Sequence, residues 1–248
     1  MPTIYKTIAI EIVAILGCIT AIAHEMPALA QSHPSTHMEG MNMGTRGTPP
    51  GKFHFLTSNE RTALQFYNQG LQKLANNDYR GAIAAFTQVV NFNPQQDMAY
   101  TYRGDIYRKL GNYQAAIDDY TKALQTNPSF TYLHNSRGNL REALGDIKGA
   151  IEDYTQAIEN YPEQATGYSN LGFALYKLGD IQGAMQNLDQ AIIVNSGDAH
   201  GYVNRAKIYI NLGKHSEAIA DYQKAKVIYW EQTRISEYLK VIVALENL

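Results

Sequence analysis

The stretch that decides the fold is residues 97–130, DMAYTYRGDIYRKLGNYQAAIDDYTKALQTNPSF, whose pattern returns in residues 131–164, TYLHNSRGNLREALGDIKGAIEDYTQAIENYPEQ. Gly104 and Gly138 stand at the same place in the two stretches, 34 residues apart. A fixed spacing of this length is typical of repeat proteins built from stacked helical hairpins. Residues of one kind recur at equivalent positions in successive repeats, and we call each such set of positions a column. The columns continue in both directions and define five units: 63–96, 97–130, 131–164, 165–198 and 199–232.

Columns of small and bulky residues predict that the two helices of each unit pack closely. The first helix carries Gly70, Gly104, Gly138, Gly172 and Ala206, and the second helix carries Ala82, Ala116, Ala150, Ala184 and Ala218. The groove beside this contact is filled by Phe86, Tyr120, Tyr154, Leu188 and Tyr222. A further aromatic column includes His134, which we expect to be a packed core residue rather than a ligand.

Glycine and proline columns predict where the helices end. The turn inside each unit holds Gly111, Gly145, Gly179 and Gly213. A left-handed residue after a helix favours glycine, so these positions predict tight turns. Proline cannot continue a helix, and the end of the second helix is followed by Pro94, Pro128 and Pro162. Ser196 replaces the proline between the fourth and fifth units, so we expect a less sharply bent junction there.

These coincident columns resemble the tetratricopeptide repeat over residues 63–232, about two thirds of the chain. The resemblance implies an all-α, right-handed α-solenoid of five helix-turn-helix units, whose first helices line a concave groove. It also implies that the groove binds a protein or an extended peptide. We therefore expect a solenoid over residues 57–232.

The two ends of the solenoid have their own features. Thr57, Ser58, Asn59 and Glu60 form the pattern of a capping box that begins the first helix. Residues 233–248 predict an amphipathic capping helix, because the last unit would otherwise expose its apolar side. Its predicted apolar face holds Ile235, Tyr238, Leu239, Ile242, Leu245 and Leu248. The alternative is a helix that binds a partner or a membrane surface.

The resemblance implies that a few positions on each first helix contact the partner. The sixth position holds Asn68, Tyr102, Ser136, Asn170 and Asn204, and asparagine there binds the peptide backbone in related proteins. Neighbouring groove positions add Asn135, Asn139, Phe173, Tyr176 and Lys207. The alternative is that these polar residues merely keep the inner face soluble. The carboxylate clamp of chaperone-binding relatives is not expected, because Tyr67 and Leu71 replace the lysine and asparagine it requires.

Acidic residues recur on the second helices. They are Asp118, Asp119, Glu152, Asp153 and Asp221. We expect them to form a solvated outer face, where ion pairs contribute little to stability.

Residues 1–30 have the plan of a secretory signal peptide. Lys6 precedes an apolar run from Ile12 to Ala23, and residues 28–30 form an A-x-A cleavage site. This predicts an exported protein, in the periplasm, the extracellular medium or a thylakoid lumen, without a stable membrane span in the mature chain. The alternatives are a lipid-anchored protein modified at Cys18 and an uncleaved anchor.

Residues 31–56 predict a flexible linker rich in histidine and methionine. Imidazole and thioether groups suit copper(I), and this tail holds His33, His37, Met38, Met41 and Met43. A copper-handling protein is therefore the alternative function, and an accident of composition is the other interpretation of the tail.

Composition excludes several function classes. The formal net charge is -2, without the basic stripe that nucleic-acid binding needs. No cysteine follows Cys18, which excludes disulfides and thiolate sites from the folded part. Known nucleotide, hydrolase and metalloprotease motifs are missing from the sequence, so we expect no enzyme and no resident cofactor. The oligomeric state is not predicted, and self-assembly through the repeats is a third alternative.

Overall fold

The computed structural model describes residues 56–248. The predicted signal peptide, Cys18, the predicted linker up to residue 55, and its histidines and methionines lie outside the described residues.

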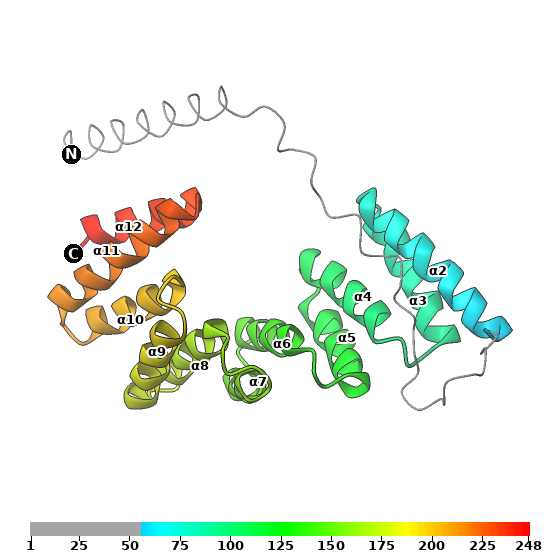
Figure 1. The fold of residues 1–248 in the computed structure, drawn as a ribbon, viewed down its shortest axis with the longest axis horizontal. Helices are drawn as coiled ribbons and strands as arrows, with labels where there is room; N and C mark the ends of the chain where they lie inside the picture. The colour runs from blue at the N-terminus through cyan, green and yellow to red at the C-terminus, as the bar shows by residue number, and fades with distance from the viewer. Residues whose placement is uncertain (1–55) are drawn as a thin grey trace, which may run out of the picture. The chain divides into compact units, whose positions relative to one another are not determined.

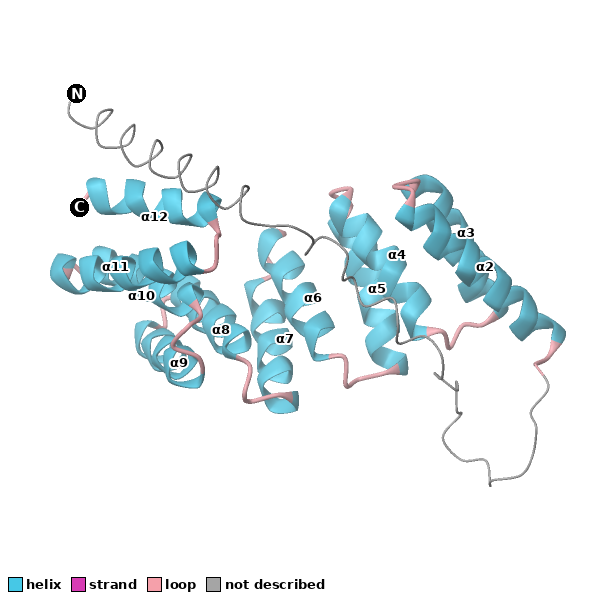
Figure 2. Ribbon diagram, turned by 45° about the horizontal axis from the view of Figure 1, so that its top comes forward, coloured by secondary structure: helices cyan, strands magenta, loops and turns pink. Residues whose placement is uncertain are grey.

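The described part of the chain is a row of helices without a strand (Figure 1). Five helical hairpins correspond to the five units, although α2 begins at Ser58, before the first unit, and one further helix ends the row. The helices are α2 (Ser58–Ala75), α3 (Tyr79–Phe92), α4 (Asp97–Lys109), α5 (Tyr113–Thr126), α6 (Thr131–Ala143), α7 (Ile147–Asn160), α8 (Ala165–Lys177), α9 (Ile181–Val194), α10 (Ala199–Asn211), α11 (His215–Glu231) and α12 (Ile235–Glu246). Short loops join each helix to the next (Figure 2). The predicted all-α solenoid is confirmed.

The small residues lie where the two helices of a hairpin touch. A Cβ atom on Gly104 would lie 2.8 Å from the ring of Tyr120, and one on Gly138 would lie 2.6 Å from the ring of Tyr154. Both tyrosines are fully buried. Ordinary packing does not allow such short contacts, so glycine sets the distance between the helices.

The turn inside each hairpin contains one residue with a positive φ angle. The values are 77° at Gly111, 87° at Gly145, 87° at Gly179 and 70° at Gly213. This confirms the predicted left-handed turns. The first hairpin uses Asn77 at φ 57° instead, which is the non-glycine residue type that best tolerates this conformation.

The junction at Ser196 does not differ from the junctions that contain proline. Asn195 ends its helix at φ -148° and ψ 95°, close to the -146° and 82° of Tyr161 before Pro162. Asp198 N also donates to Asn195 O at 3.1 Å, as Gln164 N donates to Tyr161 O at 3.2 Å. The expected softer bend is therefore wrong, because the backbone hydrogen bond holds the turn without the proline ring.

The acidic column of the second helices is divided between solvent and core. Asp118 and Glu152 are exposed as expected. Asp119, Asp153 and Asp221 are 4%, 1% and 6% exposed, so the expected solvated face is wrong for these three residues. Each buried carboxylate pairs with an arginine sixteen residues earlier on the first helix: Arg103, Arg137 and Arg205.

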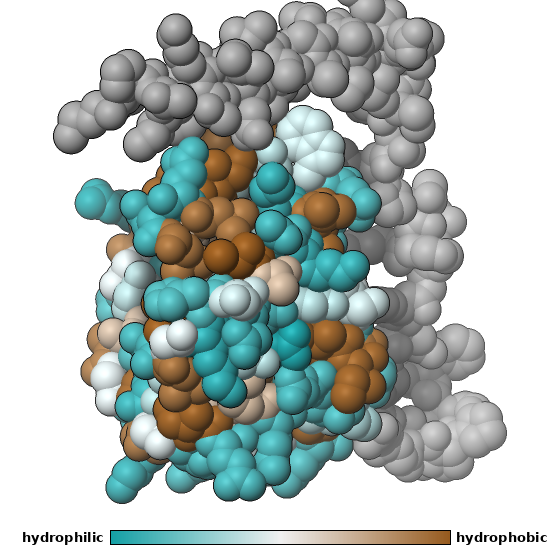
Figure 3. Space-filling view, turned by 90° about the vertical axis from the view of Figure 1, so that its left-hand side faces the viewer, coloured by the Kyte–Doolittle hydropathy of each residue, from teal (hydrophilic) through white to brown (hydrophobic). Residues whose placement is uncertain are grey.

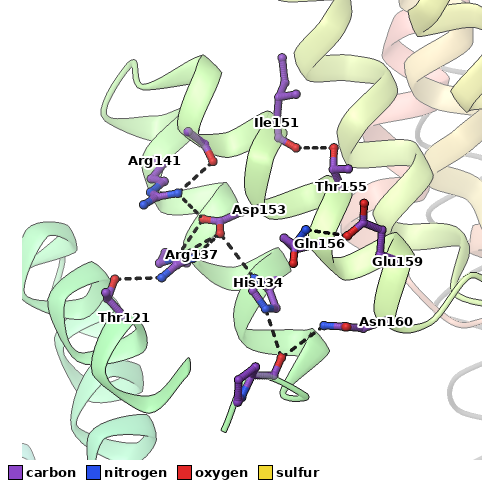
Figure 4. A network of polar contacts seen from close by, with 12 residues as sticks. Thr121, His134, Arg137, Arg141, Ile151, Asp153, Thr155, Gln156, Glu159 and Asn160 are labelled. Carbon is purple, nitrogen blue, oxygen red and sulfur yellow. Dashed lines mark hydrogen bonds and ion pairs between the residues drawn. The ribbon is translucent and has the colours of Figure 1, made fainter. Parts of the chain in front are cut away.

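Each of these arginines also bonds the second helix of the preceding unit. Arg103 Nη1 donates to Thr87 at 2.9 Å, Arg137 Nη1 to Thr121 at 3.0 Å, and Arg205 Nη1 to Asp189 at 2.6 Å. Figure 4 shows Arg137, Arg141 and His134 converging on Asp153. We call this series the arginine–aspartate ladder. It joins each of these units to the one before it.

The fourth unit interrupts the ladder. Leu171 stands where the second, third and fifth units have arginine, and Asn187 stands where those units have aspartate. Leu171 packs against a small core cluster that includes Ala150 and Tyr154. The junction between the third and fourth units is therefore held by apolar packing instead of a buried ion pair.

His134 is a packed core residue, as predicted. Its side chain is buried, and Nε2 donates to the carbonyl oxygen of Pro128 at 3.3 Å. Nδ1 lies 3.5 Å from Asp153 Oδ1. The ring thus joins the end of the preceding unit to the ladder.

The predicted capping box begins the first helix. Glu60 N donates to Thr57 Oγ1 at 3.2 Å, and Thr57 N donates to Glu60 Oε2 at 2.7 Å. Two backbone N–H groups at the start of α2 are satisfied in this way.

At the other end, α12 packs on α11 as the second helix of a further hairpin. Thr233 has φ 55°, and Arg234 N donates to Tyr229 O as Asn112 N donates to Tyr107 O in a turn inside a unit. The described residues contain no helix long and apolar enough to cross a membrane.

The buried face of α12 is rotated relative to the prediction. Tyr238 is buried as expected, but Leu239 is 37% exposed, and Val241 takes the buried place with 3% exposure. The predicted Ile235, Ile242 and Leu245 are half-buried, so the prediction is wrong for Leu239, whose place Val241 takes. Leu248 is also exposed. The α10–α12 end faces the viewer in Figure 3, where apolar patches lie among hydrophilic residues.

Candidate functional site: the face of the first helices

The row of hairpins curves toward its first helices. Within residues 56–248, α6 contacts α8 and α8 contacts α10, whereas no two second helices make comparable contact. From α6 to α10 the first helices therefore lie closer together than the second helices, which makes their free surface concave there. We call the surface formed by α2, α4, α6, α8 and α10 the A-helix face.

The N-terminal end of the A-helix face is aromatic. Tyr102 stacks on Phe86 with ring centroids 5.5 Å apart, and Tyr67 meets Tyr102 edge to face at 6.1 Å. Burial and then the neighbouring Tyr102 raise the pKa of Tyr67 above its ordinary value, so its hydroxyl stays protonated. Asn68 follows Tyr67 in α2 and is exposed.

The two asparagines predicted on α6 have different environments. Asn139 is exposed, and its Oδ1 lies 2.8 Å from the Tyr154 hydroxyl, whose one proton also faces Glu142 Oε2 at 2.9 Å. Asn135 is 8% exposed, and its Oδ1 accepts from Asn170 Nδ2 at 3.4 Å. Asn135 therefore supports Asn170 from below and does not reach a partner, whereas Asn139 stays at the surface.

Asn170 and Asn204 form a bridge across three adjacent first helices. Asn170 in α8 donates to Asn135 in α6, and Asn204 in α10 donates to the Ser169 carbonyl in α8 at 3.5 Å. Each contact is long and uses one of the two amide N–H groups. Both side chains are half-buried, so their orientation is restrained while part of each amide still faces the surface.

The C-terminal end of the A-helix face is cationic and aromatic. Phe173 and Tyr176 lie one turn apart on α8, with ring centroids 6.1 Å apart. Lys177 Nζ and Lys207 Nζ lie 5.1 Å and 5.0 Å from the Phe173 centroid. Asn211 of α10 donates to the Tyr176 hydroxyl, which orients that ring. This end can bind groups that combine apolar surface with negative charge.

Two residues at this end were not predicted. Glu142 accepts from Lys177 at 2.6 Å, and Asn211 bonds Tyr176. Both could have been found from the repeat, because Glu142 lies 34 residues before Tyr176 and Asn211 lies 34 residues after Lys177. The residues offer amides, rings and ammonium groups, which suit noncovalent binding.

Four family models match the repeats that build this face. Models described as "Tetratricopeptide repeat" match residues 98–130, 164–195 and 199–226, and one described as "TPR repeat" matches residues 138–179. The chain is a tetratricopeptide-repeat protein. The columns and departures described above are therefore variations on a tetratricopeptide repeat, and the A-helix face is its inner surface.

Solved structures of other tetratricopeptide-repeat proteins share this fold. A MamA protein has a TM-score of 0.63 at 21% sequence identity, covering 70% of this chain and 95% of its own. MamA from Desulfovibrio magneticus RS-1 has a TM-score of 0.63 at 16% identity, covering 69% of this chain and 97% of its own. YrrB, described as having an unusual peptide-binding site, has a TM-score of 0.60 at 19% identity, covering 75% and 92%. No curated protein matches the chain.

The predicted copper ligands lie in the part of the chain that the structure leaves undescribed. Among residues 56–248, no group of three or more histidine, cysteine, aspartate or glutamate side chains is placed to hold a metal ion. Of the described histidines, His134 packs in the core and His200 Nδ1 lies 2.7 Å from Asp198 Oδ1, while His215 is exposed.

Proposed function

We propose that the A-helix face binds an extended segment of a protein partner, so that the chain acts as an interaction scaffold or adaptor. The observation that carries this proposal is the pair Asn170 and Asn204. They occupy the same position in consecutive units, on contacting helices, and each is oriented by a bond to the preceding first helix. An amide can both donate to and accept from a peptide group, so two aligned amides can hold a backbone without reading its side chains.

The surroundings of the two asparagines support the same function. Tyr67 and Tyr102 lie toward one end, and Phe173, Tyr176 and Lys207 lie toward the other. Aromatic anchors with few charges are typical of the central part of a protein interface. The family's solved relative YrrB, with its peptide-binding site, offers a precedent for this use of the fold.

A peptide selection tests the proposal. Short random peptides displayed on phage would be selected against the full chain, and the affinity of the enriched peptides would be measured by fluorescence anisotropy. Replacing both Asn170 and Asn204 with alanine should weaken binding about tenfold or more, at about 1 kcal/mol for each hydrogen bond lost.

The matched control replaces two exposed amides on second helices, Gln190 and Gln223, with alanine. This control should bind as the wild type does, and circular dichroism should show equal helicity in all three proteins. Equal binding by all three proteins would place the binding site outside the A-helix face and would refute the proposal.

Export is a separate proposal that rests on residues 1–30. The mature chain would begin after Ala30 and act in the periplasm, outside the cell or in a thylakoid lumen. Mass spectrometry of the chain from the exported fraction tests this. A mass that corresponds to a chain starting at Gln31 supports export with cleavage. A lipid on Cys18 would instead indicate the anchored alternative, and an intact N-terminus in the cytoplasm would refute export.

Copper handling remains the alternative function, favoured by one sequence feature. His33, His37 and the nearby methionines bring soft thioether and imidazole ligands into one short segment. Calorimetry with copper(I) should show binding by the full chain and none by a variant in which these histidines and methionines are replaced with serine. Equal binding by both proteins would remove this alternative.

A further inference from the structure

Two lysine side chains flank one aromatic ring on the A-helix face. Lys177 Nζ and Lys207 Nζ lie 5.1 Å and 5.0 Å from the centroid of Phe173. Phe173 and Lys207 hold the ninth position of consecutive units, so the ring comes from α8 and the second ammonium group from α10. A ring attracts a cation but does not neutralise its charge.

The charges around Phe173 do not balance. Lys177 donates to Glu142 Oε1 at 2.6 Å, and Glu142 Oε2 accepts from the Tyr154 hydroxyl at 2.9 Å. Lys207 forms no ion pair with a carboxylate of residues 56–248. Lys177, Glu142 and Lys207 together therefore carry one uncompensated positive charge, and it lies on the exposed Lys207.

The pKa of Lys207 agrees with this picture. Desolvation by its neighbours, followed by the positive charge of Lys177, lowers the pKa of Lys207 below its ordinary value. Both causes disfavour the ammonium form in the unbound protein. An anion placed beside Lys207 would act in the opposite direction and stabilise the charge.

We propose that the segment bound by the A-helix face carries a carboxylate that pairs with Lys207, beside Phe173 and between α8 and α10. This inference rests on the proposed function and adds the chemical class of the segment. A carboxylate matches the single uncompensated charge, whereas a phosphate group carries nearly two negative charges at neutral pH. Asn204 lies three residues before Lys207 on the same side of α10, so its amide can donate to the second carboxylate oxygen.

This site differs from the carboxylate clamp of chaperone-binding relatives. That clamp needs a lysine and an asparagine in the first unit, where this chain has Tyr67 and Leu71. Here the cation lies in the fifth unit, next to a ring of the fourth. An Asp or Glu side chain and a C-terminal carboxylate present the same group to Lys207, so the test contains both sources.

The test compares selections from two peptide libraries against the full chain. One library ends in a free C-terminal carboxylate, and the other is fused at its C-terminus. Both are selected against the wild type, Lys207→Gln, Lys207→Arg and the control Lys214→Gln. Lys214 is also exposed and also lies over an aromatic ring, with Nζ 5.9 Å from the Tyr209 centroid, but it stands in the turn that precedes α11.

If an Asp or Glu side chain is the group bound, the wild type should enrich peptides with an acidic residue at a fixed position. If the terminal carboxylate is the group bound, the wild type should enrich peptides from the free-terminus library alone. Lys207→Arg and Lys214→Gln should keep that enrichment, and Lys207→Gln should lose it while still selecting peptides. Equal enrichment in Lys207→Gln, or peptides without acidic enrichment from the wild type, would overturn the inference and leave the proposed function standing. Selection of no peptide by any protein would overturn both.

A double-mutant cycle measures the pair directly. An enriched peptide and its Asp→Asn, Glu→Gln or C-terminally amidated form would be titrated into the wild type and Lys207→Gln. Removing the carboxylate should weaken binding to the wild type about fivefold, as expected for a partly exposed ion pair, and should leave binding to Lys207→Gln unchanged. An equal loss in both proteins would show that the carboxylate binds elsewhere and would overturn the inference.

Discussion

The guanidinium of Arg137 in α6 binds the carboxylate of Asp153 in α7 through two nitrogens, with Nε 3.0 Å from Oδ2 and Nη2 2.5 Å from Oδ1. Arg141 adds a third contact, with Nη1 2.9 Å from Oδ2. Because Arg137 also bonds Thr121 in the preceding unit, this carboxylate fixes the distance between neighbouring hairpins. The A-helix face keeps its geometry only if such contacts hold the units in place.

Replacing Asp153 with asparagine should destabilise the protein strongly. The change leaves two arginines near a neutral side chain in the core, and breaking a buried pair of this kind costs about 3 kcal/mol. Urea unfolding followed by circular dichroism measures the loss. The neighbouring exposed Glu152→Gln is the matched control and should stay within about 0.5 kcal/mol of the wild type. A small loss in Asp153→Asn would show that the ladder is not a stabilising element.

Asp119→Asn should cost less than Asp153→Asn. Asp119 has one arginine partner, and burial raises the pKa of Asp119 in spite of the contact with Arg103. Asp153 has His134, Arg137 and Arg141 around it. The charged form of Asp119 is therefore less well compensated, and its replacement by a neutral amide should destabilise by about 1 kcal/mol or less. Losses of equal size from the same unfolding experiment would contradict this ranking.

The contribution of Asp153 should disappear in acid. Burial raises the pKa of Asp153, but the contacts with His134, Arg137 and Arg141 outweigh burial and hold the pKa below its ordinary value. A carboxyl with a lowered folded pKa stabilises the fold above its unfolded pKa, and this contribution is lost as pH falls through the folded pKa. The difference in unfolding free energy between wild type and Asp153→Asn should therefore be steady near neutral pH and shrink below about pH 4. A difference that stays constant down to about pH 2 would be the contrary result.

The gap in the ladder can be closed by design. Leu171→Arg alone should destabilise, because it removes apolar packing and adds a cation without a partner. Adding Asn187→Asp should recover about 1.5 kcal/mol or more, since the new pair would repeat the geometry of Arg137 and Asp153 with Thr155 as the acceptor in the preceding unit. The coupling energy from a double-mutant cycle in urea checks this. Additive effects of the two changes would mean that the fourth unit cannot accept the pair.

The turn before α12 stores a small amount of strain. Thr233 is β-branched and has φ 55°, a conformation that glycine adopts freely. Thr233→Gly should therefore stabilise by about 1 kcal/mol, measured as a higher unfolding free energy. Gly145→Ala is the reverse control. Gly145 has φ 87° and open space around its Cβ position, so alanine would meet backbone strain alone, and the substitution should destabilise by about 1 kcal/mol. The same sign for both changes would refute this explanation.

The repeat pattern predicts most of this fold because each column acts locally. A glycine such as Gly104 and an aromatic such as Tyr120 meet within one hairpin, so their spacing is enough to place both helices. The burial of Asp153 was missed although Arg137 lies on the other helix of the same hairpin. The acidic residues were interpreted by their charge alone, whereas the spacing of sixteen residues between arginine and aspartate recurs in three units and indicates the pairs.

The candidate site was predicted in position but not in detail. Asn170, Asn204, Phe173, Tyr176 and Lys207 do lie on the A-helix face. That Asn135 is buried beneath Asn170 depends on contacts between units. Such contacts follow from how far one hairpin is rotated against the next, and a column of equivalent positions does not encode that rotation.

Side-chain amide NMR tests the central claim, that the A-helix face holds the partner segment, most directly. The Nδ2 resonances of Asn170 and Asn204 would be assigned by single alanine substitutions and followed while a selected peptide is added to the full chain. The account predicts that these two resonances shift with saturation, while the side-chain amides of Gln190 and Gln223 stay in place. Shifts confined to the glutamine amides, with Asn170 and Asn204 unchanged at saturation, would contradict it.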